Sequence, residues 1–281
     1  MSRTTATLAA SALAATALFA TSSASAAPVE PDGGGDPTPS SEAQGAGIEE
    51  PGDAAMGWKE RDPRTRTMVS APTAAASGVP GIDVSGHQGS VDWAGQYGAG
   101  KRFAFVKATE GRTYESPSFA SQYNGSYKAG FIRGAYHFAL PDSSSGANQA
   151  NHFVDEGGGW SSDGKTLPGA LDMEWNPYGA TCYGKSRSAM RSWINDFLST
   201  YKSRTGRYPV IYTNATWWTQ CVGSDTSFGQ KSPLWIARYS DTRGTLPAGW
   251  STHTFWQYTD KPIDQNVFNG SMERLRILAK S

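Results

Sequence analysis

From Val79 to its end the chain alternates short apolar stretches with longer segments, and this alternation limits the fold more than any other feature. Seven stretches have the length and flanking turn residues of strands: residues 81–85, 103–109, 132–138, 169–175, 208–214, 233–239 and 254–258. Connections of about 15–35 residues between strands are typical of parallel βα units. The pattern predicts an α/β fold, a somewhat reduced TIM-barrel-like (β/α) barrel, with an open doubly wound sheet as the alternative.

Several of the connections have helical periodicity. Residues 186–204 are the clearest case, because their apolar side chains form one stripe and Gly206 follows as a stop signal. Residues 116–129 and 148–156 are further candidates, and residues 271–280 form either a closing helix or a last irregular strand. Residues 83–89, at the end of the first predicted strand and just beyond it, are neither a dinucleotide fingerprint nor a P-loop, which argues against a nucleotide-binding sheet.

Residues 1–27 have the features of a secretory signal peptide. Arg3 gives a weakly positive start, an apolar run extends from about Leu8 to Ala20, and small residues around Ala24 and Ala26 offer a cleavage site. The run is short and alanine-rich for a membrane span. We therefore expect a secreted, extracellular protein with no membrane contact after cleavage; the alternative is an uncleaved anchor.

Residues 28–77 differ in composition from the remainder. Pro, Gly, Ala, Ser and acidic residues dominate, which predicts a disordered linker or pro-segment ahead of a catalytic barrel domain at residues 78–281. The chain is formally neutral, but seven acids lie between residue 28 and Asp53, so the remainder is mildly basic. A mildly basic exported domain suits an anionic polymer such as the bacterial wall. No run of Lys and Arg is dense enough to indicate nucleic acid binding.

Cysteine and histidine usage argues against thiol or metal chemistry. Cys182 and Cys221 are expected to form one disulfide, as an even pair in an exported chain most often does, with a catalytic thiol as the alternative. No H-E-x-x-H pattern, close metal-ligand spacing or G-x-S-x-G elbow occurs around the four histidines or elsewhere: His87, His137, His152 and His253. We expect no metal and no cofactor, and His137 to be a hydrogen-bonding residue beneath the site.

Residues 169–175 carry two acids, Asp172 and Glu174, in an apolar strand-like stretch. Alternate residues of a strand share a face, so the two are expected side by side, roughly 6.5–7 Å apart at the backbone. Burial of two neighbouring carboxylates is costly unless one is protonated or both are paired. Such a pair suits glycoside hydrolysis; the alternative is a structural network held by Arg or Lys.

Polar and aromatic residues gather at the ends of most predicted strands, where a barrel places its active site. They include Asp83, Glu110, Tyr136, Tyr212, Tyr239 and Asp264. Lys107 is expected on the same face as Phe105 and Thr109, with the role of neutralising an interior acid. This repeated polarity favours catalysis over a structural role for the acid pair.

Glycosidic cleavage needs a proton donor and a negative group near the developing positive charge. Glu174 is the better donor candidate, because a neighbouring Asp172 carboxylate favours its protonated form. Asp172 then stays ionised, either as nucleophile or to orient a substrate acetamido group. Asp83 and Asp264 are candidate floor carboxylates, with turn or capping roles as the alternative. Candidates for contact with sugar rings, each of which is otherwise a core residue, are Tyr136, Trp175, Tyr212, Trp256 and Tyr258.

Several of these motifs, in this order, resemble the Chalaropsis-type lysozymes, family 25 of the glycoside hydrolases. The motifs are G-I-D-V-S-G-H-Q-G (81–89), F-V-K-A-T-E-G (105–111), G-A-Y-H-F (134–138), L-D-M-E-W (171–175), Y-T-N (212–214) and W-Q-Y (256–258). The resemblance implies a flattened, irregular (β/α) barrel and a retaining N-acetylmuramidase that cuts the β-1,4 bond between N-acetylmuramic acid and N-acetylglucosamine in peptidoglycan.

Residue by residue, the resemblance implies roles for four acids. The family's D-x-E falls on Asp172 and on Glu174, the proton donor, and its first-strand aspartate falls on Asp83. Its late aspartate falls on Asp264, with Asp260 close by. We expect a monomer that acts on bacterial peptidoglycan. The competing hypotheses are a chitinase-like or glucosaminidase barrel and a non-catalytic wall-binding module.

Overall fold

The computed structural model describes Met1 and residues 38–60 and 78–281, and the two longer ranges belong to one compact unit, Asp36–Ser281. Apart from Met1, the predicted signal peptide lies outside the described residues. None of the helices in these ranges combines the length and apolar character that crossing a bilayer requires.

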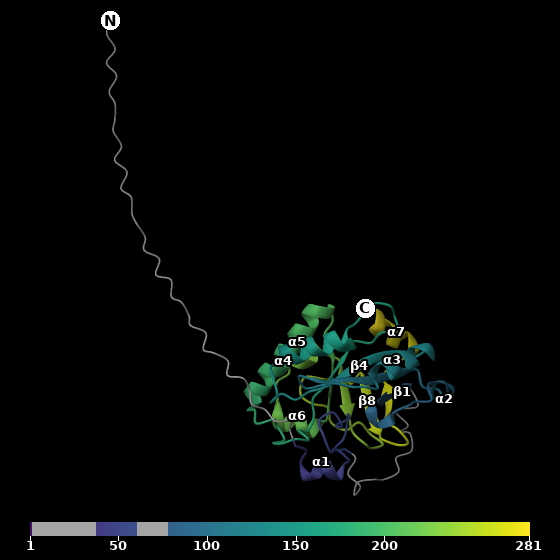
Figure 1. Ribbon diagram of the computed structural model, residues 1–281. Helices are drawn as coiled ribbons and strands as arrows, with labels where there is room; N and C mark the ends of the chain where they lie inside the picture. Colours follow the sequence, from purple (N-terminus) through teal and green to yellow (C-terminus); the bar gives the residue numbers. More distant parts are fainter. Residues whose placement is uncertain (2–37, 61–77) are drawn as a thin grey trace. The chain divides into compact units, whose positions relative to one another are not determined.

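In the described ranges, eight strands close into a barrel (Figure 1). In spatial order they are β1 (Val79–Val84), β9 (Gln265–Phe268), β8 (Phe255–Thr259), β7 (Leu234–Ala237), β6 (Val210–Thr213), β5 (Ala170–Asp172), β4 (Ile132–Phe138) and β2 (Phe103–Glu110). The parallel pairing of β2 with β1 closes the barrel and excludes an open sheet. β9 is antiparallel to both of its neighbours, and the short β3 (Tyr114–Glu115) extends β2 as an antiparallel edge.

All seven predicted strands are present, with ends within two residues of the prediction except at β5, which stops at Asp172. β9 and β3 were not predicted. β9 is short and contains Gln265 and Asn266, so its composition is not that of a strand. Its pairing with β8 and β1, far away in sequence, is what defines it.

Helices lie outside the strands, as Figure 1 shows for α3–α5 and α7. The helices are α1 (Ser41–Gly45), α2 (Trp93–Gly98), α3 (Phe119–Lys128), α4 (Gly146–Phe153), α5 (Arg187–Thr205), α6 (Ala215–Cys221) and α7 (Met272–Lys280), with a π-helical turn at Val154–Gly158 and 3₁₀ turns at Gly86–Gln88 and Ser227–Gln230. Ser186 caps α5 by accepting the Ala189 N–H, and Gly206 ends it in the left-handed region at φ 80°. At the end of the chain, α7 shows that residues 271–280 form a closing helix and not a last strand.

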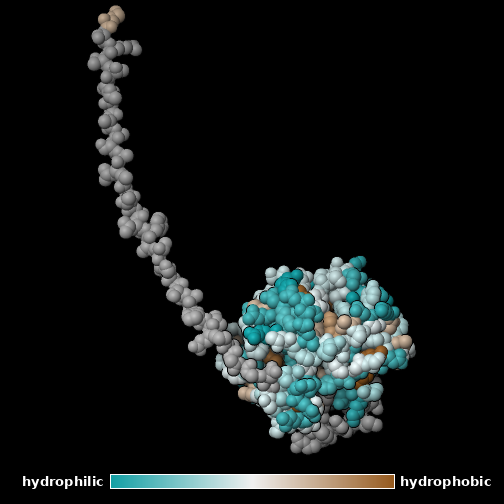
Figure 2. All heavy atoms as spheres, in the orientation of Figure 1, coloured by the Kyte–Doolittle hydropathy of each residue, from teal (hydrophilic) through white to brown (hydrophobic). Residues whose placement is uncertain are grey.

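Side chains fill the barrel interior. The Phe105 and Trp235 rings lie 4.6 Å apart between centroids, and the Tyr212 ring packs edge-on against Trp235 at 5.1 Å. Alternate residues face the helices instead: Leu171 and Ile211 pack in the outer cluster that contains α5 side chains. Hydrophilic residues dominate the face shown in Figure 2. This alternation decides which residues of each strand can reach a site inside the barrel.

The predicted disulfide between Cys182 and Cys221 is confirmed. It joins the loop after β5 to the last residue of α6. The Trp217 indole N–H donates to the Thr181 carbonyl oxygen at 3.0 Å, beside the same link. The loop that follows the acid pair is therefore fixed to the helix that follows β6.

Candidate active site

Asp172 and Glu174 lie at the carboxyl end of β5, and each is only 1% exposed. Asp172 is in register with Tyr212 of β6, whose ring is inside the barrel. The predicted strand is too long, because β5 ends at Asp172 and Glu174 lies beyond it. The Met173 N–H still donates to the Tyr212 carbonyl oxygen at 2.9 Å, and its side chain joins Leu171 in the outer cluster. The two acids therefore face away from that cluster.

The two carboxylates differ in their surroundings. Neither oxygen of Asp172 has a hydrogen-bonding partner among the described residues. Burial, and then the charge of Glu174, raise the pKa of Asp172 well above its usual range, while Lys107 acts in the opposite direction. Glu174 Oε1 accepts the Gly57 N–H at 2.7 Å, a contact that favours a charged carboxylate. Burial therefore favours a protonated Asp172 here, whereas the Gly57 N–H lies against Glu174, the expected proton donor.

Asp83 and Asp264 meet beside this pair. Asp83 Oδ2 accepts amide N–H groups of Gln257, at 3.0 Å, and of Asn266, at 2.6 Å. The Tyr239 hydroxyl donates to Asp264 Oδ1 at 3.1 Å, and the Asp83 N–H donates to the Asp264 carbonyl oxygen at 3.3 Å. Both acids are 2% exposed. They are brought together by β1, β8 and β9, which converge at this edge of the barrel.

Tyr136 lies close enough to three of the carboxylates to feel their charges. It is fully buried, and burial followed by the charges of Asp83, Asp172 and Asp264 raises its pKa well above the usual value. A neutral phenol is a hydrogen-bond donor, so the Tyr136 hydroxyl can donate to a negative or polar group. The structure thus collects the four predicted acids and this tyrosine at one end of the barrel.

A β-bulge brings the Glu110 side chain to Lys107 in the same site. Lys107 pairs with Tyr136 of β4, but Thr109 pairs with the very next residue, His137, so Ala108 is an extra residue in β2. Lys107 Nζ and Glu110 Oε2 form a buried ion pair at 2.6 Å. The neutralising role predicted for Lys107 is confirmed. Its predicted alignment with Thr109 is wrong, because the bulge turns Thr109 toward His137.

The predicted sugar-contacting aromatics divide into two groups. Tyr136 and Tyr212 lie in the interior cluster, and Trp175 is half-buried immediately after Glu174. Trp256 and Tyr258 lie instead in a separate cluster with Ile236 and Val267, on the opposite face of β8 from the inward-pointing Gln257. The structure does not bring Trp256 and Tyr258 to the acids.

Three polar site residues were not singled out from the sequence. Gln257 accepts the Tyr212 hydroxyl at 2.6 Å as well as binding Asp83, and Asn266 accepts the Trp235 indole N–H at 2.8 Å. Tyr178 contacts Glu110 from the loop after β5. The sequence did contain a signal for Gln257. It lies between two aromatics of a predicted strand, and strand alternation places it on the opposite face from both of them.

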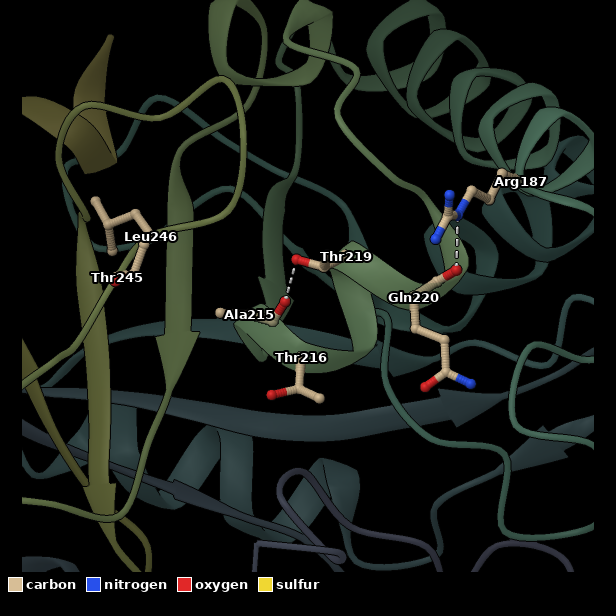
Figure 3. A pocket seen from close by; sticks show the side chains of 7 residues that line it. All are labelled: Arg187, Ala215, Thr216, Thr219, Gln220, Thr245 and Leu246. Carbon is tan, nitrogen blue, oxygen red and sulfur yellow. Dashed lines mark hydrogen bonds between the residues drawn. The ribbon is translucent and has the colours of Figure 1, made fainter.

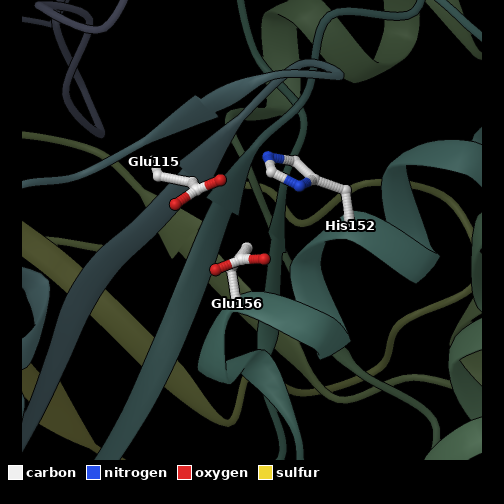
Figure 4. Close-up of side chains that lie close together, drawn as sticks. All are labelled: Glu115, His152 and Glu156. Carbon is white, nitrogen blue, oxygen red and sulfur yellow. The ribbon is translucent and has the colours of Figure 1, made fainter.

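Two other features lie apart from these acids. A pocket beside α6 is lined by Arg187, Ala215, Thr216, Thr219, Gln220, Thr245 and Leu246, as Figure 3 shows. In the described ranges, one group of side chains has metal-ligand spacing, with ligand atoms within 4.8 Å of one another (Figure 4): Glu115, His152 and Glu156. Neither feature contains a catalytic candidate, so we assign them no part in the chemistry.

Residues 82–267 match the model of glycosyl hydrolases family 25. The chain belongs to this family. It is therefore a glycoside hydrolase of the lysozyme type, and family 25 membership accounts for the closed mixed barrel. The muramidase of Acremonium alcalophilum, a solved structure, is 58% identical with a TM-score of 0.71, and the match covers 72% of this chain and 99% of that one.

Two members of the lysozyme group are also similar to this chain in sequence. The chain is 48% identical to the N,O-diacetylmuramidase of Chalaropsis sp over 208 residues, which are 72% of this chain and 99% of that protein. It is 49% identical to lysozyme M1 of Streptomyces globisporus over 246 residues, which are 82% of this chain and 83% of that protein. Residues 78–281 make up less than three quarters of the chain, so the match to lysozyme M1 extends beyond the barrel domain.

Proposed function

We propose that this chain is a secreted lysozyme that hydrolyses the β-1,4 bond between N-acetylmuramic acid and N-acetylglucosamine in peptidoglycan, with retention at the anomeric carbon. The observation that carries the proposal is the buried pair Asp172 and Glu174 at the carboxyl end of β5, beside Asp83 and Asp264. Relatives named lysozyme M1 and N,O-diacetylmuramidase support the substrate. The signal-like sequence of residues 1–27 supports export.

In the proposed reaction Glu174 donates its proton to the glycosidic oxygen as the bond to the anomeric carbon breaks. Asp172 is ionised at this stage and stabilises the positive charge that develops on the sugar. It does so as the nucleophile or by orienting the substrate acetamido group, and both routes invert the anomeric carbon twice and so retain its configuration. Glu174 then takes a proton from the water that completes hydrolysis.

The floor of the site would position these groups. Asp83 is held by the amides of Gln257 and Asn266, so the orientation of its carboxylate is fixed, and its charge acts on Tyr136. Tyr136 and Tyr212 offer ring faces and hydroxyls at the depth of the acids, and Trp175 lies at the rim. Peptidoglycan strands are long, so we expect the substrate to cross this end of the barrel.

The test is the rate at which purified bacterial walls lose turbidity. Replacement of the general acid in Glu174→Gln should lower kcat by about 10²- to 10⁴-fold with little change in melting temperature. Glu115→Gln, the same substitution at an exposed acid of β3, is the matched control and should keep the parent rate. A Glu174→Gln variant that clears walls at the parent rate would remove Glu174 as the acid.

The identity of the bond is tested on the products. Muramic acid at the new reducing end is expected, and glucosamine there would favour the glucosaminidase hypothesis. Nuclear magnetic resonance at early times should show the β-anomer first, because two inversions retain the starting configuration. An initial α-anomer would overturn retention while leaving the lysozyme activity itself intact.

A further inference from the structure

Residues 52–58 lie across the end of the barrel where the acids converge. Lys107 Nζ, at the end of β2, donates to the Gly52 carbonyl oxygen at 2.7 Å and also contacts the Ala54 carbonyl oxygen. The Gly52 N–H donates to Glu110 Oε1 at 3.2 Å. The buried Lys107–Glu110 pair thus binds the backbone of residues 52–54 through one N–H group and two carbonyl oxygens. These contacts join positions more than fifty residues apart in sequence.

Met56 inserts its side chain into the barrel. It is fully buried and belongs to the interior cluster that contains Tyr136, Tyr212 and Trp235. Two of these aromatics are the rings proposed above to face the sugar. The apolar side chain of residue 56 therefore covers surface that the proposed function assigns to substrate.

Gly57 contacts Glu174, the proposed catalytic acid, through its backbone. Its N–H donates to Glu174 Oε1 at 2.7 Å, and its φ of 72° is a conformation that favours glycine. A Cβ at this position would lie 2.5 Å from the Tyr239 hydroxyl, 2.7 Å from Gln257 Oε1 and 3.0 Å from the Tyr212 hydroxyl. No side chain larger than hydrogen fits between the segment and these groups without displacing one of them.

Anchors on both sides of Gly57 hold the segment in place. The Trp58 indole N–H donates to the Trp175 carbonyl oxygen at 3.0 Å, and Lys59 Nζ lies 4.7 Å from the centroid of the Trp175 ring. On the N-terminal side, the Ser40 N–H donates to the Pro177 carbonyl oxygen at 2.7 Å. The segment therefore contacts Trp175 as well as Glu174.

We propose that residues 52–58 are a built-in ligand of the glycan-binding cleft and that the intact chain is a latent precursor. The proposal rests on the proposed function, since that function defines the cleft. A polysaccharide must bring its glycosidic oxygen to Glu174, but Glu174 is 1% exposed and already accepts the Gly57 amide. Substrate and residues 52–58 cannot occupy this end of the barrel together.

The surroundings of the two acids support the same conclusion. Burial and the Glu174 charge raise the pKa of Asp172, which has no hydrogen-bond partner among the described residues, while Gly57 favours a charged Glu174. The proposed reaction needs a proton on Glu174, where the Gly57 N–H now donates to Oε1. Departure of residues 52–58 would admit solvent to Asp172 and remove the amide from Glu174.

Covalent attachment makes such a ligand effective without high intrinsic affinity. Attachment to the same chain gives an effective concentration on the order of 1 mM, so a segment that binds with a Kd of about 10 μM when separate fills the cleft about 99% of the time when attached. Once separated from the barrel at submicromolar enzyme, the same segment would dissociate. The match to lysozyme M1, which extends beyond the barrel domain, agrees with a function for this part of the chain.

The test compares two glycine substitutions in the intact chain. Gly57→Val places a side chain against Tyr239 and Gln257 and should raise the initial rate of wall hydrolysis at least tenfold. Gly47→Val is the matched control: Gly47 also has a positive φ, of 83°, but its Cβ would meet no atom within 4 Å. It should leave the low rate of the intact chain unchanged. Met56→Asp should raise the rate as Gly57→Val does, because burial of a carboxylate among the aromatics is costly. If Gly57→Val does not fold, the rate of Met56→Asp tests the proposal.

A binding measurement separates this proposal from the proposed function. In a Glu174→Gln background, co-sedimentation with walls should be weak for the intact chain and at least tenfold stronger after Gly57→Val. If binding increases but Gly57→Val with Glu174 in place releases no reducing sugar, the cleft is closed by residues 52–58 and the enzymatic assignment fails instead. Equal binding and equal hydrolysis by the intact chain, Gly57→Val and Met56→Asp would overturn the proposal.

Discussion

At the scale of single residues, the protonation state of His137 follows from its burial and its two hydrogen-bond partners. His137 lies between Thr109 Oγ1, 2.8 Å from Nδ1, and Gln149 Oε1, 2.9 Å from Nε2. An amide oxygen can only accept, so Nε2 carries the proton and the Thr109 hydroxyl donates to Nδ1. Burial lowers the pKa of His137 to about 3. The residue is therefore neutral, and its two hydrogen bonds agree with the hydrogen-bonding role expected from the sequence.

The stability of the protein should fall in acid because of His137. The unfolded chain binds a proton as pH drops below about 6.5 and the native chain does not, so the free energy of unfolding decreases until pH approaches 3. By pH 4.5 the loss from this residue is about 3 kcal/mol. Denaturant unfolding at pH 6.5 and 4.5 measures it.

The matched variants isolate the His137 effect. His137→Asn should shrink the pH-dependent loss even if it lowers stability at both pH values. Part of the loss should persist through His253, whose pKa burial lowers to about 4, and His253→Asn should remove that part. An undiminished difference between the two pH values in His137→Asn would contradict this explanation.

At the scale of elements, one extra residue in β2 shapes the site. Without the bulge at Ala108, side chains of Lys107 and Glu110 would point to opposite faces of the strand, because their separation is odd. With it, the two form a buried ion pair at 2.6 Å on the inner face. Sequence alternation alone predicted the face of Lys107 but not its partner, since a bulge has no reliable local signal.

Breaking this ion pair should be costly, whereas removing both charges should not. Lys107→Met leaves Glu110 buried and uncompensated and should lower the free energy of unfolding by about 3–5 kcal/mol. The double variant Lys107→Met with Glu110→Leu should recover a large part of that loss. Urea unfolding of the parent, the two single variants and the double variant gives the coupling. Strictly additive losses would show that the pair does not act as a unit.

At the scale of the whole molecule, the disulfide links the loop after β5 to the end of α6. Cys182 follows the acid pair by one loop, and Cys221 ends α6, 39 residues later. Chain-entropy reasoning assigns about 4 kcal/mol to a link that closes a loop of this length. The hydrophobic core is large, so we expect the fold to persist without the link.

Replacing both cysteines by alanine should lower the melting temperature by about 10 °C, given the size of the domain. Calorimetry of the double variant against the parent under non-reducing conditions measures the change. The parent treated with reductant is the chemical control and should shift similarly. A melting temperature that does not change on either treatment would show that the link contributes nothing to stability.

The sequence by itself determined the features that depend on local periodicity. The spacing of apolar stretches predicted the barrel, the D-x-E pattern predicted the acids Asp172 and Glu174 at the end of β5, and the two cysteines predicted their link. These follow from sequence because a strand or helix that buries one face must repeat its apolar residues at a fixed interval.

Only the tertiary structure decided the features that depend on contacts between distant parts of the chain. β9 is a strand because β8 and β1 pair with it, and Trp256 faces outward because barrel closure turns Gln257 inward. Residues 28–77 have the composition of a linker or pro-segment, yet Met56 is buried and Gly57 binds Glu174. Composition predicts what a segment can bury by itself, but not whether a preformed cavity in the same chain will bury it.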